Sequence, residues 1–202
     1  MATDFLFSPI RSDCVADVVT HLKKSGIWQP FDERAVSFVN ELSSRLLKYP
    51  GINKFPDLVA LAYWFRRSNI KKLSQAYTNS DNFIRAGRGL ALHISPSNVD
   101  TIFVYSFFLS LLSGNTNFIR VSQSQSAQLD ILIELFSDIH NSGVSEASAR
   151  FAICTYPHDN EVTSFVSQNC DLRLIWGGDA TVSEIATIPL KPTALELKFA
   201  NR

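Results

Sequence analysis

The sequence is poor in the residues that mark several protein classes, and each shortage excludes one of them. Only three of the 202 residues are cysteine, Cys14, Cys154 and Cys170, and this odd, scattered set predicts a reducing compartment rather than a disulfide framework. Eight glycines and eight prolines are too few for a collagen-like or low-complexity chain. Nineteen basic residues balance nineteen acidic ones, so we expect no nucleic-acid partner.

Long apolar runs are also missing. The most apolar segment extends over the eleven residues from Ile102 to Leu112, whereas a membrane-spanning helix needs about 20. The N-terminus has no basic stretch followed by an apolar run, so it does not resemble a secretory signal. Together these features predict a cytoplasmic protein without a membrane span.

What the sequence does contain is enough apolar material for a core. Hydrophobic residues make up 46% of the chain and 15 residues are phenylalanine. A single domain of this length buries roughly 70% of the surface that its unfolded chain exposes. Disorder is therefore excluded as the main state.

The chain up to residue 82 has the pattern of a helical segment. One helix is predicted over Phe31–Tyr49, with Asp32 as its N-cap and Pro50-Gly51 as its end. Its apolar stripe consists of Ala35, Phe38, Val39, Leu42 and Leu46. A second helix is predicted to open near Pro56, a residue favoured in a first turn, and to continue to Leu73.

From Gly87 onward, short apolar runs alternate with segments of helix length. Strands are predicted at 89–94, 117–121, 150–155, 172–176 and 194–199, and helices at 99–113, 127–140, from about 160, and at 180–188. This alternation predicts an α/β fold with a mainly parallel, Rossmann-like sheet. We expect a helical segment over residues 1–82 and an α/β nucleotide-binding domain over 83–202, which together form one compact unit.

In such a sheet, ligands bind at the carboxyl ends of the strands, where loops lead into helices. The loops at 95–98, 122–125 and 177–179 are therefore the candidate sites. Gly177-Gly178-Asp179 opens a helix, so its backbone amides suit a phosphate. A tight turn with Asp179 as N-cap explains the same residues without a ligand.

Two polar residues at these strand ends each allow two interpretations, one structural and one functional. Asn98 suits an N-cap, and it equally suits an amide that donates to a developing oxyanion. Arg120 is either a solvated charge at a strand end or a guanidinium that holds a nucleotide ribose or phosphate. The trio Cys154, His158 and Cys170 matches no established zinc spacing, so we expect no metal.

Taken in order, several segments resemble one family. The runs ELSSRLL, FPDLVALAYWFRRSNI, GLALHISPSNVDTIFVYSFFLSLLSGNTNFIRVS and LIWGGDAT together are similar to the LuxC-type fatty acyl-CoA reductases, a branch of the aldehyde dehydrogenase superfamily. The resemblance extends from about Phe31 to the end of the chain. It implies an aldehyde-dehydrogenase-type fold and NADPH-dependent reduction of a fatty acyl thioester to an aldehyde, through a thioester on an enzyme cysteine.

The resemblance also implies roles for the residues at the strand ends. Pro96-Ser97-Asn98 matches the superfamily's Pro-Trp-Asn element, with Ser97 in place of tryptophan, which makes Asn98 the oxyanion donor. Ser95 precedes this element in the same loop. Arg120 falls where the superfamily usually has a ribose-binding lysine, and Gln123 where NAD-preferring members often carry a glutamate.

The difference at Gln123 bears on the choice of cofactor. A glutamate would repel a 2′-phosphate, whereas a neutral Gln123 beside Arg120, with Ser122 and Ser124 nearby, accommodates one. We therefore expect NADPH rather than NADH.

Two further segments are carried over by position. Gly177-Gly178-Asp179 resembles the superfamily's Gly-Ser turn at the pyrophosphate. Glu196, in ALELKF, lies where the superfamily has a Leu-Glu-Leu segment with a general base, although Lys198-Phe199 departs from the usual Gly-Gly.

The nucleophilic cysteine of the superfamily follows the segment that matches Glu196, and this chain stops at Arg202. We therefore expect a fold that is incomplete relative to the family, in which this chain supplies the cofactor site and the oxyanion donor but is inactive alone. The expected partners are acyl-CoA or an acyl-protein thioester, and either a second copy or a subunit that carries the catalytic half. The alternative is a non-catalytic binding or interaction module with the same fold.

Overall fold

The computed structural model describes residues 3–78, 83–95, 101–123, 126–157 and 160–200. Within these residues, six strands form one sheet in the order β1-β4-β3-β2-β5-β6. The strands are β1 (Asp4–Phe7), β2 (Leu90–Ile94), β3 (Thr116–Arg120), β4 (Phe151–Thr155), β5 (Leu172–Gly177) and β6 (Leu195–Ala200). β1 is antiparallel to β4, and all other neighbouring pairs are parallel. The prediction of an α/β fold with a mainly parallel sheet is confirmed.

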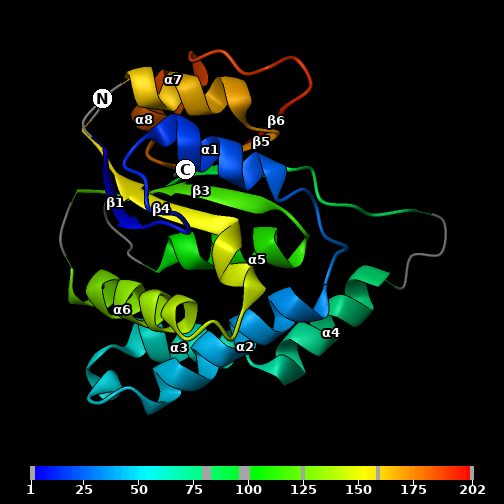
Figure 1. Ribbon diagram of the computed structural model, residues 1–202, viewed down its shortest axis with the longest axis vertical. Helices are drawn as coiled ribbons and strands as arrows, with labels where there is room; N and C mark the ends of the chain where they lie inside the picture. The colour runs from blue at the N-terminus through cyan, green and yellow to red at the C-terminus, as the bar shows by residue number, and fades with distance from the viewer. Residues whose placement is uncertain (1–2, 79–82, 96–100, 124–125, 158–159, 201–202) are drawn as a thin grey trace.

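Helices cover both faces of this sheet (Figure 1). One face carries α1 (Val15–Lys24), α7 (Asn160–Asn169) and α8 (Asp179–Ala186), and the other carries α5 (Ile102–Leu112) and α6 (Ala127–Asn141). An outer layer beyond α5 and α6 consists of α2 (Glu33–Lys48), α3 (Pro56–Trp64) and α4 (Arg67–Thr78). Two short 3₁₀ helices, η1 (Ile52–Lys54) and η2 (Glu146–Arg150), complete the described elements.

The strand order reverses beside β2. From β2 the chain crosses to β3 and then to β4 on one side, and it returns to place β5 and β6 on the other side. Helices that follow strands on the two sides of such a reversal leave a crevice between them at the carboxyl ends of the strands. This topology predicts a ligand site at the ends of β2 and β5.

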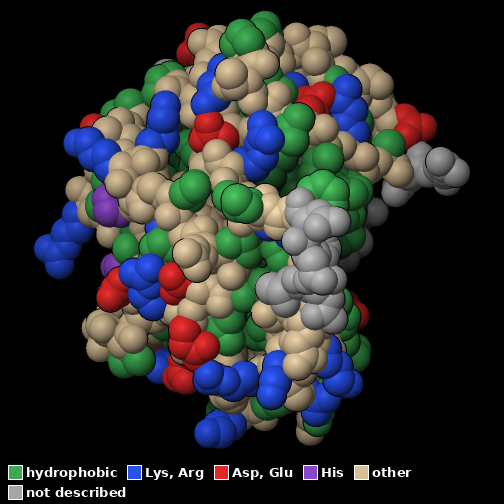
Figure 2. All heavy atoms as spheres, turned by 90° about the vertical axis from the view of Figure 1, so that its right-hand side faces the viewer, with side chains coloured by type: hydrophobic (Ala, Val, Ile, Leu, Met, Phe, Trp, Pro, Cys, Tyr) green, Lys and Arg blue, Asp and Glu red, His purple; other side chains and the backbone are tan. Residues whose placement is uncertain are grey.

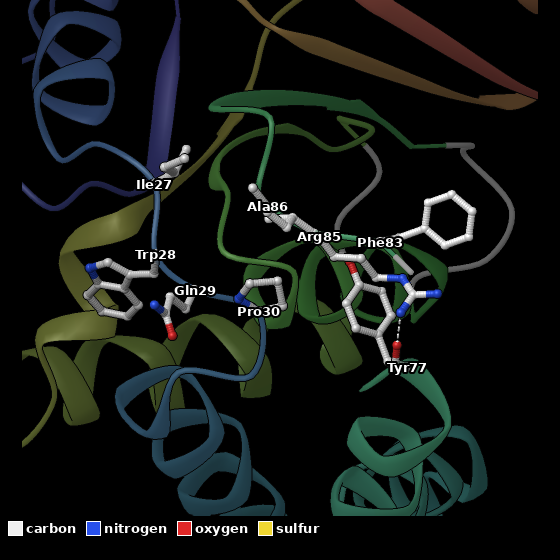
Figure 3. Close-up of a pocket in the computed structure, with 9 residues that line it drawn as sticks. Ile27, Trp28, Gln29, Pro30, Tyr77, Phe83, Arg85 and Ala86 are labelled. Carbon is white, nitrogen blue, oxygen red and sulfur yellow. Dashed lines mark hydrogen bonds between the residues drawn. The ribbon is translucent and has the colours of Figure 1, made fainter. Parts of the chain in front are cut away.

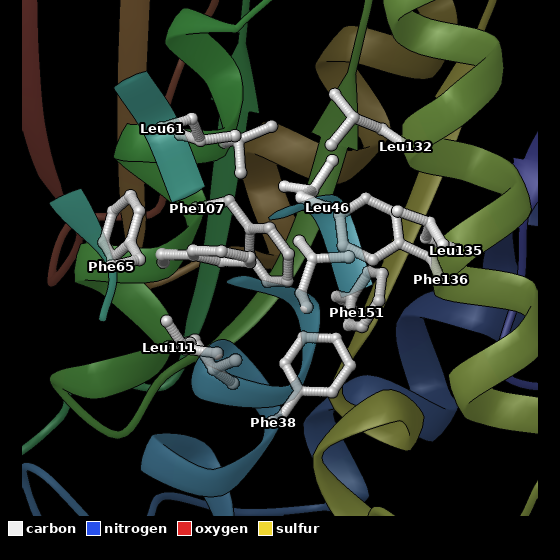
Figure 4. Packing of buried hydrophobic residues seen from close by; sticks show 14 of the residues in the cluster. Phe38, Leu46, Leu61, Phe65, Phe107, Leu111, Leu132, Leu135, Phe136 and Phe151 are labelled. Carbon is white, nitrogen blue, oxygen red and sulfur yellow. The ribbon is translucent and has the colours of Figure 1, made fainter. Parts of the chain in front are cut away.

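The main core lies between the sheet and the outer helices, and it is rich in phenylalanine (Figure 4). The ring of Phe151 on β4 lies 4.5 Å from that of Phe107 on α5 and 5.2 Å from that of Phe136 on α6. Most residues of α5 are buried because this helix is enclosed by the sheet on one side and by α2 on the other. This enclosure explains the apolar run of α5. Among the described residues, no helix has the length and apolarity required to cross a membrane.

The predicted helix at 31–49 is confirmed, and the one after Pro56 is shorter than predicted. The carboxylate of Asp32 accepts a hydrogen bond from the backbone N–H of Arg34 and caps α2, as expected. The segment from Pro56 divides into α3 and α4 because asparagine side chains bond to backbone groups that would otherwise bond to each other along one continuous helix. Asn69 Nδ2 donates to the carbonyl of Trp64 (2.7 Å), and the N–H of Arg67 donates to Asn40 Oδ1 (3.2 Å).

Sequence reasoning missed β1 and α1. β1 pairs with β4 at the edge of the sheet, and α1 packs on β3, so the segment up to residue 82 is not helical throughout. The division into units at residues 82 and 83 stays a prediction.

On the face shown in Figure 2, basic and acidic side chains are interspersed among neutral ones.

The linker between α1 and α2 crosses the amino ends of the strands and is fixed there. The N–H of Trp28 donates to the carbonyl of Gly114 (2.9 Å), and Arg150 donates to the carbonyls of Ser25, Gly26 and Gly114. The guanidinium carbons of Arg34 and Arg150 lie 3.9 Å and 4.0 Å from the centre of the Trp28 ring. These contacts hold the linker against the turn that precedes β3.

Candidate nucleotide-binding site

The carboxyl ends of four parallel strands meet at one edge of the sheet. In register, Ile94 of β2 lies between Arg120 of β3 and Ile175 of β5, and Arg120 lies beside Cys154 of β4. Neighbouring strands are about 4.8 Å apart. The three loops predicted as candidate sites therefore begin at adjacent positions of one sheet edge.

Four buried polar atoms at this edge have no hydrogen-bond partner within the described part of the chain. They are Thr3 Oγ1 before β1, Ser95 Oγ after β2, Arg120 Nε at the end of β3 and Thr155 Oγ1 at the end of β4. Buried polar groups in proteins are nearly always paired, so each exception needs a reason. Orphan donors on three successive strand ends are what a site for a polar ligand requires.

Arg120 is oriented by the loop that follows β4. Its Nη2 donates to the carbonyl of Tyr156 (3.4 Å), and its guanidinium carbon lies 5.4 Å from the centre of the Tyr156 ring. The side chain is thus held at the strand end and is half-buried rather than solvated. This geometry holds the guanidinium at the strand end, and a ligand-binding role for Arg120 stays a prediction.

The glycine turn after β5 differs from the predicted N-cap. Gly177 ends β5, and Gly178, not Asp179, is the N-cap of α8, with no side chain bonded to the first-turn amides. A Cβ added at Gly178 would have no atom within 4 Å, and Asp179 is exposed. The first backbone N–H groups of α8 therefore have no side-chain cap, and the binding of a phosphate there stays a prediction.

Ser122 and Gln123 lie on the β4 side of Arg120. Both line a hollow of about 380 Å³ beside β1 and α6, whose wall also carries the carboxylates of Asp4 and Asp130. Pro96, Ser97 and Asn98 lie outside the described residues, as do Ser124 and His158. The oxyanion role of Asn98 therefore stays a prediction.

Sequence reasoning missed a buried polar network that joins β3, β2, α5 and β5. Asn117 Nδ2 donates to the carbonyl of Asn115, so Asn117 Oδ1 faces His93 Nε2 (3.0 Å), which must carry the proton. His93 Nδ1 then accepts from the hydroxyl of Ser106 (2.9 Å), and that hydroxyl accepts from Trp176 Nε1 (3.3 Å). Each donor in this network of four side chains has an acceptor.

The network contains a neutral histidine and fixes the end of β5. Burial lowers the pKa of His93 to about 4, against an opposing hydrogen bond with Asn117. Trp176, at the other end of the chain of bonds, is the residue before Gly177, and its ring stacks on that of Phe199 at 3.9 Å. The glycine turn thus follows directly on an anchored tryptophan. A histidine in an otherwise apolar strand, two residues before Ser95, was the signal in the sequence.

Glu196 does not reach the strand-end site. It is the second residue of β6 and lies opposite Arg173, whereas Gly177 lies opposite Ala200, four residues further along, or about 13 Å. Its carboxylate accepts hydrogen bonds from the buried guanidinium of Arg173 and forms an ion pair with Lys198. Burial alone would raise the pKa of Glu196, but the bonds from Lys198 and Arg173 outweigh it and lower the pKa. These surroundings suit a structural ion pair rather than a general base.

The buried cysteines are poor nucleophiles. Burial strongly raises the pKa of the Cys154 thiol, and it raises that of Cys170 to about 11. A reactive thiol needs a lowered pKa or an adjacent base. Cys14 is exposed and is the N-cap residue of α1. Within the described residues, no group of three histidine, cysteine or acidic side chains could hold a metal ion.

A second hollow lies at the amino ends of the strands, beside the linker that carries Trp28 (Figure 3). Its volume is about 530 Å³, and its lining includes Tyr77, Phe83 and Arg85. Arg85 is already engaged, because it donates to the carbonyl of Tyr77 and lies over the Tyr77 ring. Sequence reasoning gave no sign of this hollow.

Comparison with solved structures defines the class of fold. The chain superposes on betaine aldehyde dehydrogenase from Staphylococcus aureus, solved with NAD+, with a TM-score of 0.67 and 11% identity, over 98% of this chain and 47% of that one. For propionaldehyde dehydrogenase from Rhodopseudomonas palustris, solved with bound propionyl-CoA, the TM-score is 0.60 and the identity 13%, over 95% and 47%. The fold is that of the aldehyde dehydrogenases, as predicted, and the chain spans less than half of either structure.

Comparison with protein families places the chain in one family within this class of fold. Residues 63–202 match the acyl-CoA reductase (LuxC) family, and this is more than half of the chain. A long-chain acyl-protein thioester reductase from Aliivibrio fischeri is 24% identical over 117 residues, which cover 56% of this chain and 24% of that protein. The chain belongs to the acyl-CoA reductase (LuxC) family, and it spans about a quarter of the length of this curated relative.

Proposed function

We propose that this chain forms the dinucleotide-binding part of an NADPH-dependent reductase that converts a fatty acyl thioester, on CoA or on a protein, to an aldehyde. The observation that carries the proposal is the row of orphan buried donors at the ends of β2, β3 and β4, beside the uncapped glycine turn after β5. Family membership supports the acyl thioester, and the relatives solved with NAD+ and propionyl-CoA support these ligand classes.

The residues present fit a dinucleotide. Gly177 and Gly178 leave room for a pyrophosphate, and the first amides of α8 would donate to it. Ser95 and Arg120 would hold the adenosine ribose, and Arg120 would pair with a 2′-phosphate. Ser122 and Gln123 would lie beside this phosphate, at a hollow whose wall also carries the carboxylates of Asp4 and Asp130. Bound NADPH would supply the hydride that reduces the acyl carbonyl.

The remaining catalytic roles divide between this chain and groups elsewhere. We assign Asn98 the role of the amide that donates to the carbonyl oxygen as negative charge develops there. Glu196 is left out of the catalytic machinery because Arg173 and Lys198 hold it in the sheet. Since Cys154 and Cys170 are buried and unreactive, we expect the 202-residue chain not to reduce acyl-CoA. The same observation favours the alternative of a non-catalytic binding module. Weak binding of the cofactor is a separate expectation. The cytoplasmic location stays a prediction.

Calorimetric titration with NADPH and NADH tests the cofactor site. We expect the chain to bind NADPH more tightly than NADH, because Arg120 would meet the 2′-phosphate. Replacing Arg120 with alanine removes a charge-assisted hydrogen bond worth about 1.5–3 kcal/mol, so the Kd for NADPH should rise roughly ten- to a hundredfold. The Kd for NADH should change little, and Arg120→Lys should keep part of the preference.

Arg66→Ala serves as the control, because Arg66 is exposed at the junction of α3 and α4. Tighter binding of NADH by the unmodified chain would refute NADPH as the cofactor. Equal weakening of both cofactors by Arg120→Ala would refute the pairing of Arg120 with the 2′-phosphate. Absence of binding by either cofactor would favour the non-catalytic module.

A further inference from the structure

Arg120 lies on the face of the sheet that α7 and α8 cover. Alternate residues of a strand share a face, and Phe118, two residues before Arg120 on β3, packs in one cluster with Val162 and Val166 of α7. α8 covers the same face (Figure 1). Its amino end follows β5, which is two strands from β3 in the sheet, or about 10 Å along the edge. The guanidinium of Arg120 and the glycine turn are therefore on one side of the sheet.

Tyr156, the residue that follows β4, contacts Arg120 in two ways. Its ring centre lies 5.4 Å from the guanidinium carbon, and its carbonyl accepts a hydrogen bond from Nη2 (3.4 Å). Tyr156 is only 2% exposed and packs with Val162 and Val166 of α7. Its hydroxyl is hydrogen-bonded to Thr163 Oγ1 (3.1 Å), as a buried phenol requires. A fixed aromatic ring thus lies beside a long and otherwise flexible cation.

These contacts orient the guanidinium and leave donors for an anion. The carbonyl of Tyr156 takes one of the five N–H groups of Arg120, and Nε has no partner within the described part of the chain. A side chain that is held in place before its ligand arrives loses less conformational entropy on binding than a free one. The planar guanidinium is also the cation that an aromatic face holds best. Tyr156 therefore has the properties of a residue that prepares Arg120 for a phosphate.

We propose that Tyr156 is a positioning residue, which sets the preference for NADPH over NADH by holding Arg120 at the place of the 2′-phosphate. The inference rests on the proposed function, because it takes Arg120 as the partner of that phosphate. Since the ring acts through Arg120, its removal weakens the binding of NADPH and not that of NADH. A purely structural role would lower the free energy of unfolding and leave the ratio of the two Kd values unchanged.

Calorimetric titration of Tyr156→Leu with both cofactors tests the proposal. We expect the Kd for NADPH to rise about three- to tenfold, because an arginine without its ring contact must be ordered on binding, and the Kd for NADH to stay within about twofold. Tyr156→Phe should keep most of the preference, since the ring remains in place. In an Arg120→Ala background, Tyr156→Leu should change the ratio of the two Kd values no further.

The matched control is Phe151→Leu. Phe151 is a buried aromatic residue of the same strand, but it lies at the amino end of β4 and contacts the rings of Phe107 and Phe136. This variant should lose stability and keep the ratio of the two Kd values.

A second variant removes the dependence on folding of Tyr156→Leu. Pentafluorophenylalanine in place of Tyr156 keeps the shape of the ring and inverts the electrostatic potential of its face, so the attraction for the guanidinium is lost. The preference for NADPH should fall relative to Tyr156→Phe, which serves as its reference.

The possible failures separate this inference from the proposed function. An unchanged ratio in both Tyr156→Leu and the pentafluorophenylalanine variant, a further change in the Arg120→Ala background, or an equal loss of preference in Phe151→Leu would overturn the role of Tyr156 alone. Binding of neither cofactor by the unmodified chain, or tighter binding of NADH, would overturn the proposed function and this inference with it.

Discussion

Replacing Gly114 with alanine is expected to lower the free energy of unfolding by at least about 3 kcal/mol. Gly114 has a φ of +94°, where a side chain strains the backbone, and an added Cβ would overlap the carbonyl oxygen of Trp28. The linker cannot move away easily, because Trp28 bonds to Gly114 and its ring is held by Arg34 and Arg150. Urea unfolding followed by circular dichroism measures the loss.

Gly143→Ala separates the two causes. Gly143 also has a positive φ, +65°, but an added Cβ there would meet no atom within 4 Å. Only backbone strain remains, so the expected loss is about 1–2 kcal/mol. If the two variants lost equal stability, the close approach of the Trp28 linker to Gly114 would be wrong.

Stability is expected to fall by about 2 kcal/mol between about pH 7 and about pH 5 because His93 is buried in its neutral form. The pKa of His93 is about 4 in the folded chain, against an ordinary value of 6.5. Over the interval between these values the unfolded chain takes up a proton that the folded chain does not, so acid favours unfolding. Since one pKa unit corresponds to about 1.4 kcal/mol, the full loss approaches about 3 kcal/mol near pH 4.

His93→Gln isolates this contribution. Glutamine keeps an amide that can donate to Asn117 but does not titrate, so the variant should lose its share of the pH dependence even if its stability at neutral pH is lower. Urea unfolding of both proteins across this pH range measures the slopes. Identical slopes would show that His93 is not the buried neutral group described here.

The alternating strands and helices could be predicted from the sequence because each has its own local pattern. Runs such as LRLIW and RFAICT are apolar enough to read as buried strands, and Asp32 and Pro56 mark helix starts where the structure has them. β1 could not be predicted in this way, since four residues carry no periodicity and the strand depends on pairing with β4. The break between α3 and α4 depends on Asn40, which is distant in sequence.

The strand-end location of the site followed from topology, whereas the surroundings of its residues did not. Glu196 pairs with Arg173 because the two are opposed in register between β5 and β6, and no spacing along the chain indicates that register. An arginine inside the apolar run LRLIW was the one available sign, because a buried guanidinium requires an acidic partner. The network from Asn117 to Trp176 was hidden for the same reason, since it joins three strands and a helix.

Hydrogen exchange with and without NADPH decides whether the cofactor lies across the ends of β3, β2 and β5. With NADPH present, slower exchange is predicted at the backbone amides of Gln123 after β3 and of Gly178 and Asp179 after β5, whereas the amides of Ser95 and Val121 already donate to Arg120 and Cys154 within the sheet. Protection confined to the hollow beside Trp28 and Arg85, or no change at saturating NADPH, would contradict a dinucleotide site at the carboxyl edge of the sheet.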